Sequence, residues 1–456
     1  MNSNQPYRLW PILVTAMYAS FMNPFMLSAI NITLPDIQKY FNCSASTLSW
    51  ISNAFLIANA IVLLPFSKAA DMWGRVKIFE YGLFTFTIFT FLAAFSPNIT
   101  FLIVMRIFQG IGAAFMHVTS LAIVTSVYPP EKRGVALGLN IGAVYAGLSM
   151  GPFIGGLLTN IGGWKFVFIS VVPLGIFAIL LSVFNLRKIH IDKSTGKFDL
   201  TGSLIYAVVI FCVVFGGGKI LTSKGLLIFI FGIIAGVWFF IYENKQESPI
   251  FNIRLFKGSR MFAFSNMAAL IHYSATFSIG FMLSLYLQFV KGLSPRDAGL
   301  ILIAQPIVMA ITAPLTGRLS DKIRPGILAS SGMFITLAGL LALTFIGSET
   351  SMTVIIGILL FIGLGFGLFS SPNTNAIMGS VDKKNYGVAT GLTASMRVLG
   401  QTFSMMIATI FISLFLGKMQ LSQENSDLFL KCMKICFSIF TALCIPGVWF
   451  SLQRNK

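Results

Sequence analysis

Long apolar runs constrain the fold of this chain more than any other feature. Fourteen stretches contain almost no charged side chains, and each is close to the roughly 20 apolar residues that a helix needs to cross the hydrocarbon of a bilayer. We therefore predict an all-α polytopic membrane protein with 14 transmembrane helices. The predicted spans are 9–34, 47–66, 78–96, 100–126, 135–158, 165–186, 200–218, 225–242, 261–289, 297–316, 326–346, 352–372, 387–415 and 432–451.

Composition excludes several other classes of protein. Charged residues make up only 10% of the chain, whereas soluble domains have about 25%. The net charge of +18 is scattered between the apolar runs without forming a stripe, so no nucleic acid partner is expected. The five cysteines lack the spacing of a metal or redox site, and no P-loop signature for ATP occurs, so we expect neither a metal nor another cofactor.

The distribution of basic residues predicts the orientation in the membrane. An even number of spans places both termini on one side, and the loops on that side hold 21 Lys and Arg residues against 9 on the other. The remaining two, Arg106 and Arg397, fall inside spans. Because cytoplasmic loops carry the excess of positive charge, both termini are predicted to be cytoplasmic in the plasma membrane. The first run, Leu9 to Leu34, lacks a small-residue cleavage site and is expected to remain as the first span.

Two pairs of similar segments indicate that the chain contains an internal repeat. Gly134-Val-Ala-Leu-Gly-Leu139 opens the fifth span, and Gly387-Val-Ala-Thr-Gly-Leu392 opens the thirteenth. Ser67-x-x-x-Asp71 and Gly317-x-x-x-Asp321 likewise follow spans two and ten. We therefore predict two six-helix bundles plus two extra helices, with a site between the bundles. The predicted parts are the N-terminal bundle, 1–190; the inserted helix pair with its linkers, 191–250; and the C-terminal bundle, 251–456.

A glycine-rich string, residues 147–156, lies inside the fifth predicted span. It reads Gly-Leu-Ser-Met-Gly-Pro-Phe-Ile-Gly-Gly. Gly147, Gly151 and Gly155 recur every four residues and share one helix face, where a second helix can approach closely. Pro152 removes a backbone hydrogen bond and bends the helix. The string is typical of a moving helix, although a static packing seam has the same glycine spacing.

The whole string resembles the fifth-helix motif G-x-x-x-G-P-x-x-G-G of the major facilitator superfamily, which is associated with exporters. The resemblance implies the major facilitator fold and a conformational role for Gly147, Gly151, Pro152, Gly155 and Gly156. An enzyme is not expected, because the sequence contains no intramembrane carboxylate pair, metal cluster or nucleophile constellation.

The loop after the second span places charges beside a tight turn. Ser67-Lys-Ala-Ala-Asp-Met-Trp-Gly-Arg-Val-Lys77 has one carboxylate and two cations near helix ends, a pattern that a solvated turn also shows. The segment resembles the superfamily motif G-x-x-x-D-R-x-G-R-R/K, in which the Asp belongs to a breakable charge relay that latches one conformation. The matching residues are Asp71, Gly74, Arg75 and Lys77, and the departures, which predict a weaker latch, are Ser67, Met72 and Val76.

The fourth predicted span contains an arginine. A charged side chain deep in a bilayer costs about 2.5–3.5 kcal/mol, so such a residue usually has a partner or a task. Arg106-Ile-Phe-Gln-Gly-Ile-Gly-Ala-Ala114 resembles the superfamily motif R-x-x-Q-G-x-G-A-A, whose Arg is linked to proton coupling. The resemblance implies coupling roles for Arg106, Gln109 and Gly110.

Shorter segments narrow the resemblance to the fourteen-span drug:proton antiporter family of the QacA/EmrB type, from about residue 10 to the last span. In span one that family carries an Asp where this chain has Met26. Without a mid-span acid a cationic drug lacks a carboxylate to offset its desolvation, so neutral or weakly charged lipophilic substrates are expected. The segments are Trp164–Phe168, Val172–Gly175, Phe198–Gly202, Ile253–Phe256, Tyr286–Gln288 and Leu293–Pro295.

Proton carriers and cavity residues are expected among the remaining polar residues of the spans. The candidate carriers are His272, His117 and Asp36, and His272 is favoured because Arg106 shares a helix face with His117. The candidate substrate cavity comprises Asn23, Asn31, Asn53, Tyr273 and Gln305. Each of these polar residues has a second interpretation as a hydrogen bond between helices, as have Asn59, Asn373 and Asn375.

These patterns and the resemblance predict a secondary active transporter that exports lipophilic or drug-like small molecules by proton antiport with alternating access. Its partners are then a small lipophilic substrate, protons and the lipid bilayer. Within transport, the alternative is a specific transporter of a metabolite, a lipid or an organic anion on the same fold. The alternative of another class is a non-transporting membrane receptor or scaffold, which would not need Arg106 or the string 147–156.

Overall fold

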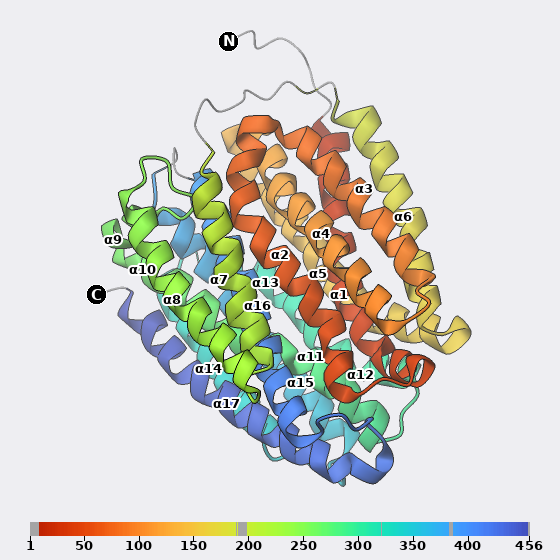
Figure 1. The fold of residues 1–456 in the computed structure, drawn as a ribbon. Helices are drawn as coiled ribbons and strands as arrows, with labels where there is room; N and C mark the ends of the chain where they lie inside the picture. The colour runs from red at the N-terminus through yellow and green to blue at the C-terminus, as the bar shows by residue number, and fades with distance from the viewer. Residues whose placement is uncertain (1–8, 188, 190–197, 321, 383–385, 455–456) are drawn as a thin grey trace.

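The computed structural model of the protein describes residues 9–187, 189, 198–320, 322–382 and 386–454 (Figure 1). All regular structure in these residues is helical. Fourteen helical spans within them are long and apolar enough to cross a membrane, which confirms the predicted all-α membrane fold. Asp321 and the predicted boundary at 190–191 lie outside the described residues.

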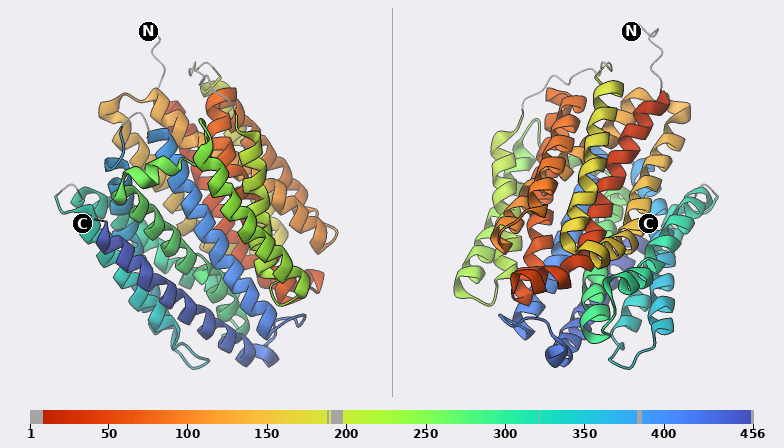
Figure 2. Two further views of the ribbon diagram at one scale, coloured as in Figure 1. Left: turned by 60° about the vertical axis from the view of Figure 1, so that its left-hand side comes forward. Right: turned by 90° about the vertical axis from the view of Figure 1, so that its right-hand side faces the viewer.

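The chain forms two sets of helices, and a helical hairpin lies between them in chain order (Figures 1 and 2). The first set is α1 (Leu9–Phe41), α2 (Ala45–Trp73), α3 (Arg75–Ala94), α4 (Ile99–Val127), α5 (Pro130–Gly162) and α6 (Trp164–Asn185). The hairpin is α7 (Leu200–Gly218) and α8 (Ser223–Lys245). The second set is α9 (Ile253–Gly258), α10 (Arg260–Thr276), α11 (Ser278–Leu285), the π-turn η1 (Tyr286–Val290), α12 (Pro295–Leu302), α13 (Ala304–Leu319), α14 (Pro325–Leu343), α15 (Met352–Gly379), α16 (Tyr386–Phe415), the short η3 (Gln423–Asn425) and α17 (Ser426–Gln453).

Several helices extend beyond the predicted spans. The first was predicted to end at Leu34, but α1 continues to Phe41. Hydropathy marks only the part of a helix that crosses the hydrocarbon, whereas hydrogen-bonded caps set where the helix begins. Ser44, for example, accepts a hydrogen bond from the backbone N–H of Thr47 at the start of α2.

Two predicted spans are interrupted. The ninth span, predicted at 261–289, consists of α10, α11 and the π-turn η1. Near its break, the backbone N–H of Ser278 donates to Oγ of Ser404 in α16, 3.0 Å away. The tenth span is divided into α12 and α13, where Pro306 has no N–H for the usual intrahelical bond. Interrupted helices of this kind are typical positions of hinges.

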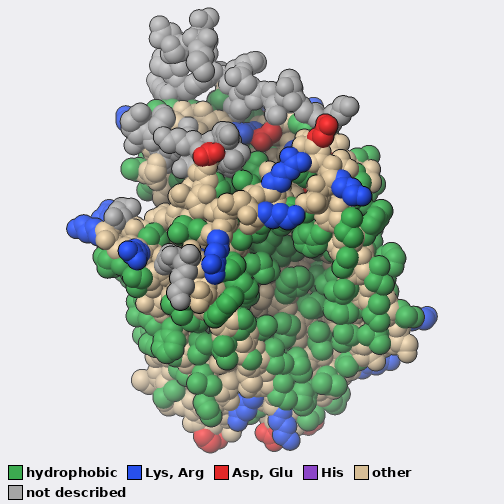
Figure 3. Space-filling view, turned by 90° about the vertical axis from the view of Figure 1, so that its left-hand side faces the viewer, with side chains coloured by type: hydrophobic (Ala, Val, Ile, Leu, Met, Phe, Trp, Pro, Cys, Tyr) green, Lys and Arg blue, Asp and Glu red, His purple; other side chains and the backbone are tan. Residues whose placement is uncertain are grey.

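Apolar side chains cover the middle of the molecule. Figure 3 shows hydrophobic side chains over this band, with Lys, Arg, Asp and Glu toward the two ends. Large exposed apolar residues lie on the outer helices; Phe184 of α6 and Ile234 of α8 are 72% and 63% exposed. Exposure of this extent is favourable in lipid, so the protein is a multi-pass membrane protein.

The hairpin α7–α8 lies against both sets of helices. The helix α7 packs on α2 of the first set and on α16 of the second, while α8 packs mainly on α7. Tyr206 of α7 donates a hydrogen bond to the backbone oxygen of Ala60 in α2, 3.3 Å away. The inserted pair therefore adds to the outside of the seam between the two sets.

Candidate functional site

The glycine-rich face of α5 packs against α1. A Cβ added at Gly147 would overlap the carbonyl oxygen of Phe21, and one added at Gly155 would lie 2.8 Å from Cβ of Ala29. Gly151 lies between these two positions on the same face. The backbones of α1 and α5 can therefore come into direct contact, because the positions of α5 that face α1 are glycines.

Gly156 lies on another face of α5 and meets α12 of the second set. A Cβ added at Gly156 would overlap the carbonyl oxygen of Pro295, and one added at Gly299 would overlap that of Pro152. The contact is reciprocal, because each helix presents a Pro-x-x-x-Gly segment whose glycine faces the proline carbonyl of the other. It joins the two sets at the end away from the N-terminus (Figure 1).

Hydrogen bonds between the sets close the same end. Oγ of Ser284 in α11 donates to the backbone oxygen of Asn31 in α1, 2.6 Å away. Nε2 of Gln38 in α1 donates to the backbone oxygen of Leu421, which precedes α17, at 2.9 Å. We call this end, with the contact between α5 and α12, the closed end.

Nearer the N-terminus, α5 moves away from the second set. Tyr145 of α5 faces the second set, since its hydroxyl lies 2.7 Å from that of Ser370 in α15. Gly138 lies seven residues earlier, on the same face of α5. A Cβ added there would meet no described atom within 4 Å. The two sets therefore separate along α5 beyond Tyr145.

A second seam, between α2 and α16, holds the sets together. Nδ2 of Asn53 donates to Oγ1 of Thr409, 2.6 Å away. Farther along α2, Ser67 lies opposite Gly391, where an added Cβ would be 3.3 Å from the serine side chain. Ser67, which departs from the superfamily loop motif, thus packs opposite Gly391 of the second set.

The loop motif forms contacts within the first set. Gly74 takes φ +109° between α2 and α3, and Nε of Arg75 donates to the carboxylate of Asp71 at 2.6 Å. The same guanidinium donates to the hydroxyl of Ser126 at the end of α4. Lys77 is exposed. The motif therefore ties the turn to α4, and a latching role for it stays a prediction.

Asp71→Asn is expected to shift the balance between the two conformations by up to about fivefold, because a partly exposed ion pair contributes about 0.2–1 kcal/mol. The measurement is the rate at which Gly138→Cys is labelled by a maleimide in the Asp71→Asn and parent backgrounds. Glu80→Gln is the matched control, since it removes the ion pair between Glu80 and Arg187, 3.0 Å apart, in the same set. Equal labelling with and without Asp71 would make this residue an ordinary turn residue.

Arg106 is fully buried within the first set. Its guanidinium donates to the backbone oxygen of Ile51 at 3.2 Å and to the side chain of Gln109. It also lies over the ring of Phe55, 4.3 Å from the centroid. Gly110 allows the backbones of α4 and α2 to meet at the carbonyl of Phe55. The motif therefore binds α4 to α2.

The two candidate histidines lie in different surroundings. The ring of His272 is fully buried and stacks on Phe369 at 4.1 Å, and neither ring nitrogen has a hydrogen-bond partner among the described residues. His117 is half-buried and faces the second set, where the charge of Arg397 acts on it. The cation near His117 is thus Arg397 rather than Arg106, because Arg106 is engaged three helical turns away.

Asp36 lies at the closed end. Its carboxylate accepts a hydrogen bond from the backbone N–H of Trp164, 2.7 Å away, at the start of α6. Met26 of α1 is fully buried. Asp36 also lines a cavity of about 370 Å³ between the sets, with Pro35, Gln38, Lys39, Gln288, Phe289, Leu293, Pro295, Gln420 and Leu421.

The predicted cavity residues are not all brought together. Asn53 and Asn31 lie in the contacts between the sets described above, and Asn23 is buried with no partner for Oδ1 in the described part of the chain. Gln305 is half-buried in α13. Tyr273 lies in an aromatic cluster between the sets, formed by Tyr145, Tyr273, Met309, Ala313 and Phe366.

Arg397 of α16 also belongs to this cluster, because its guanidinium lies 5.3 Å from the ring centroid of Tyr273. The sequence identified Arg397 as a charge within a span but assigned it no role. A charge inside a membrane span is costly, and this argument, which assigned a role to Arg106, applies equally to Arg397.

Other predicted polar residues bond helix to helix. The side-chain oxygen of Asn373 accepts a hydrogen bond from the guanidinium of Arg454 at 2.6 Å. Nδ2 of Asn375 donates to the hydroxyl of Ser320, also at 2.6 Å. These two asparagines therefore stabilise the second set.

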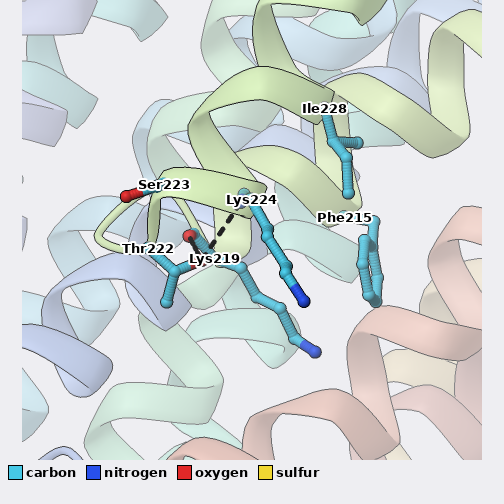
Figure 4. Close-up of a pocket in the computed structure, with 7 residues that line it drawn as sticks. Phe215, Lys219, Thr222, Ser223, Lys224 and Ile228 are labelled. Atoms are coloured by element: carbon cyan, nitrogen blue, oxygen red, sulfur yellow. Dashed lines mark hydrogen bonds between the residues drawn. The ribbon is translucent and has the colours of Figure 1, made fainter.

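A further cavity lies at the turn between α7 and α8, away from the predicted site. Figure 4 shows its lining, in which the side chains of Lys219 and Lys224 extend beside Phe215. Its volume is about 560 Å³. None of the candidate residues lines it, so we assign it no part in the site.

Membrane-spanning helices in two sets, which meet closely at one end and separate along α5 at the other, define a membrane transporter of the two-bundle type. The chain belongs to the Major Facilitator Superfamily, whose family model matches residues 16–405. Membership of this family indicates transport rather than catalysis.

Curated relatives include transporters of several kinds. The chain is 32% identical over 459 residues to a riboflavin transporter, RibZ, of Clostridioides difficile, covering 98% of each chain. It is 28% identical to the multidrug resistance protein Stp of Mycobacterium tuberculosis, covering 82% of this chain and 70% of that one. It is 26% identical to the tetracenomycin C resistance and export protein of Streptomyces glaucescens, covering 90% and 77%.

Solved structures share the fold. One is the crystal structure of a bacterial homolog to the human lysosomal transporter Spinster, inward-facing and unoccupied, with a TM-score of 0.73 and 17% identity over 99% of this chain and 98% of that one. Another is the human organic anion transporter MFSD10, with a TM-score of 0.66 and 13% identity over 98% and 100%. These similarities establish the fold alone.

Proposed function

We propose that the protein is a fourteen-span drug:proton antiporter that exports lipophilic or drug-like small molecules by alternating access. It lies in the plasma membrane with both termini cytoplasmic, as the 21 basic residues on that side favour. In this proposal residues 1–190 and 251–456 are the two bundles, and 191–250 is the inserted pair.

One observation carries the proposal. The two sets contact each other closely at Pro152, Gly156, Pro295 and Gly299, yet an added Cβ at Gly138 meets no described atom. Two bundles that are in close contact at one end and apart along α5 at the other are what one half of an alternating-access cycle requires. The contact at the closed end consists of glycines and proline carbonyls, which can separate without breaking an ion pair.

The relatives support export of drug-like compounds, because their names include a multidrug resistance protein and a tetracenomycin C export protein. The full-length similarity to a riboflavin transporter favours a second candidate, a specific transporter of one planar aromatic metabolite. The same fold serves both functions, so the substrate decides between them.

The deciding experiment is transport in proteoliposomes. Nile red, a neutral lipophilic dye, and riboflavin are each tested with and without an imposed pH gradient, and then with a protonophore. We expect uphill movement of Nile red that the protonophore abolishes. Movement of riboflavin alone would favour the specific transporter, whereas movement of neither would support the receptor or scaffold.

We further propose His272 as the proton carrier, with Gly147, Gly151 and Gly155 as the sliding face of α5. Both nitrogens of His272 lack partners among the described residues, and buried polar atoms without partners often mark functional positions. A proton that moves through 100 mV supplies about 2.3 kcal/mol. In this proposal Arg106, Gln109 and Gly110 organise the first set during coupling, and His117 and Asp36 are the alternative carriers.

His272→Phe is expected to uncouple transport while it preserves the stacking on Phe369. A coupled antiporter builds a substrate gradient of about tenfold per pH unit for each proton exchanged, and the variant should build none. The measurement is Nile red accumulation under a pH gradient, with downhill movement as the control for folding. Full accumulation by His272→Phe together with loss in Asp36→Asn would transfer the assignment to the carboxylate.

A further inference from the structure

Arg397 stands in the middle of a membrane span. It lies eleven residues after the start of α16 at Tyr386, about 16 Å along the helix. Its side chain is half-buried, and its guanidinium lies over the ring of Tyr273 in α10. Tyr273 in turn belongs to one cluster with Tyr145 of α5, in the other set. Arg397 therefore faces the space between the two sets rather than lipid.

Two arginines that are more deeply buried than Arg397 have hydrogen-bond partners in the protein. Arg106 donates to a backbone oxygen and to Gln109. Arg454 donates to Asn373, to the hydroxyl of Ser451 and to a backbone oxygen. Within the described residues, by contrast, Arg397 forms no hydrogen bond or ion pair, and its buried Nε lacks an acceptor.

The surroundings of Arg397 offer aromatic surface and positive charge. Tyr273, Tyr145 and Phe366 belong to one cluster beside it, and the rings of Tyr273 and Phe366 lie 5.6 Å apart. None of the 14 acidic residues of the sequence lies in the middle of a span. The described ion pairs, Asp71 with Arg75 and Glu80 with Arg187, are both in the first set. A guanidinium in this position lacks an anion.

We propose, building on the transport function above, that Arg397 binds the anionic group of the substrate and that the substrates are planar aromatic compounds carrying an acidic group. The ring system packs on Tyr273 and Phe366, and the carboxylate, sulfonate or ionised phenol accepts hydrogen bonds from the guanidinium.

A partly desolvated guanidinium gains most from a carboxylate-like acceptor, because such pairs frequently form two parallel charge-assisted hydrogen bonds, each about twice as strong as a neutral one. The contact with Tyr273 holds the planar group in place without using its N–H donors. A cationic compound would meet the positive charge of Arg397, so the site selects against it.

Two dyes with one ring scaffold and opposite charge test the proposal. Fluorescein is an anion and rhodamine 123 is a cation, and both are xanthenes. Binding to purified protein in detergent is measured by fluorescence anisotropy. We expect wild-type protein to bind fluorescein more tightly. Arg397→Gln should weaken fluorescein binding by about tenfold or more without weakening rhodamine 123, and Arg397→Lys should fall between.

Arg260→Gln is the matched control, because Arg260 also lies over an aromatic ring, Phe264 at 5.0 Å, but at the start of α10. It should bind both dyes as the wild type does, and thermal melting checks that all variants are folded. The proposal is overturned if fluorescein binds Arg397→Gln undiminished, if both dyes weaken equally, or if the wild type shows no preference for fluorescein. Nile red efflux tests the export function separately, so the two can fail independently.

Discussion

Gly151→Leu is expected to abolish transport while the protein remains folded and inserted. A Cβ at this position would overlap Oγ of Ser28 and lie 2.7 Å from the carbonyl oxygen of Phe25, so leucine fits only if α1 and α5 separate. Overpacking of this kind costs about 1–3 kcal/mol, and the added side chain is apolar, so insertion should not suffer. Nile red efflux from proteoliposomes should fall by about tenfold or more.

Gly142→Leu on the same helix is the control, because an added Cβ at Gly142 meets no described atom within 4 Å. It should transport at the wild-type rate. The double variant Ser28→Gly, Gly151→Ala should be more active than Gly151→Ala alone, because the side chain of Ser28 lies nearest to the added Cβ. Wild-type efflux from Gly151→Leu would rule out a close α1–α5 contact in the transport cycle.

Gly299→Val should open the closed end of the molecule. The side chain would meet the carbonyl oxygen of Pro152, so the contact between α5 and α12 could not form without a shift of backbone. A cost of about 1–3 kcal/mol would reduce the population of this conformation by about fivefold to 150-fold. The measurement is labelling of Ser284→Cys in intact cells by an impermeant maleimide, because Ser284 is fully buried in this conformation.

The reciprocity of the contact supplies a second test. Gly156→Val should accelerate the same labelling, because Gly156 meets Pro295 as Gly299 meets Pro152. Gly357→Val in α15 is the control, since an added Cβ there has no described neighbour within 4 Å. If labelling stays slow in both Gly299→Val and Gly156→Val, the contact between α5 and α12 does not hold the end closed.

The glycine string illustrates how far the sequence reached. The four-residue spacing of Gly147, Gly151 and Gly155 predicted one smooth helix face, and α1 lies along that face. Gly156 was grouped with them, but neighbouring helical residues point about 100° apart, so it meets α12 instead. Its partner Gly299 could not be found from spacing, because the two glycines are distant in the chain.

The intramembrane arginines also show what the sequence predicts and what only the structure adds. The sequence located both Arg106 and Arg397 within apolar runs, because a charge in such a run is visible in any window. Whether the protein satisfies that charge depends on residues of other helices. Arg106 is bonded within its own set, whereas Arg397 faces the other set without a hydrogen bond in the described part of the chain.

The sequence by itself determined the fourteen spans and the membrane fold, because a helix in lipid satisfies its own backbone and needs only local apolar length. Tertiary structure alone decided which end of the molecule is closed. The reciprocal meeting of Gly156 and Gly299 and the exposure of Arg397 depend on how the two sets pack against each other. Close packing of this kind is set by matching shapes between distant segments, which no local pattern of residues records.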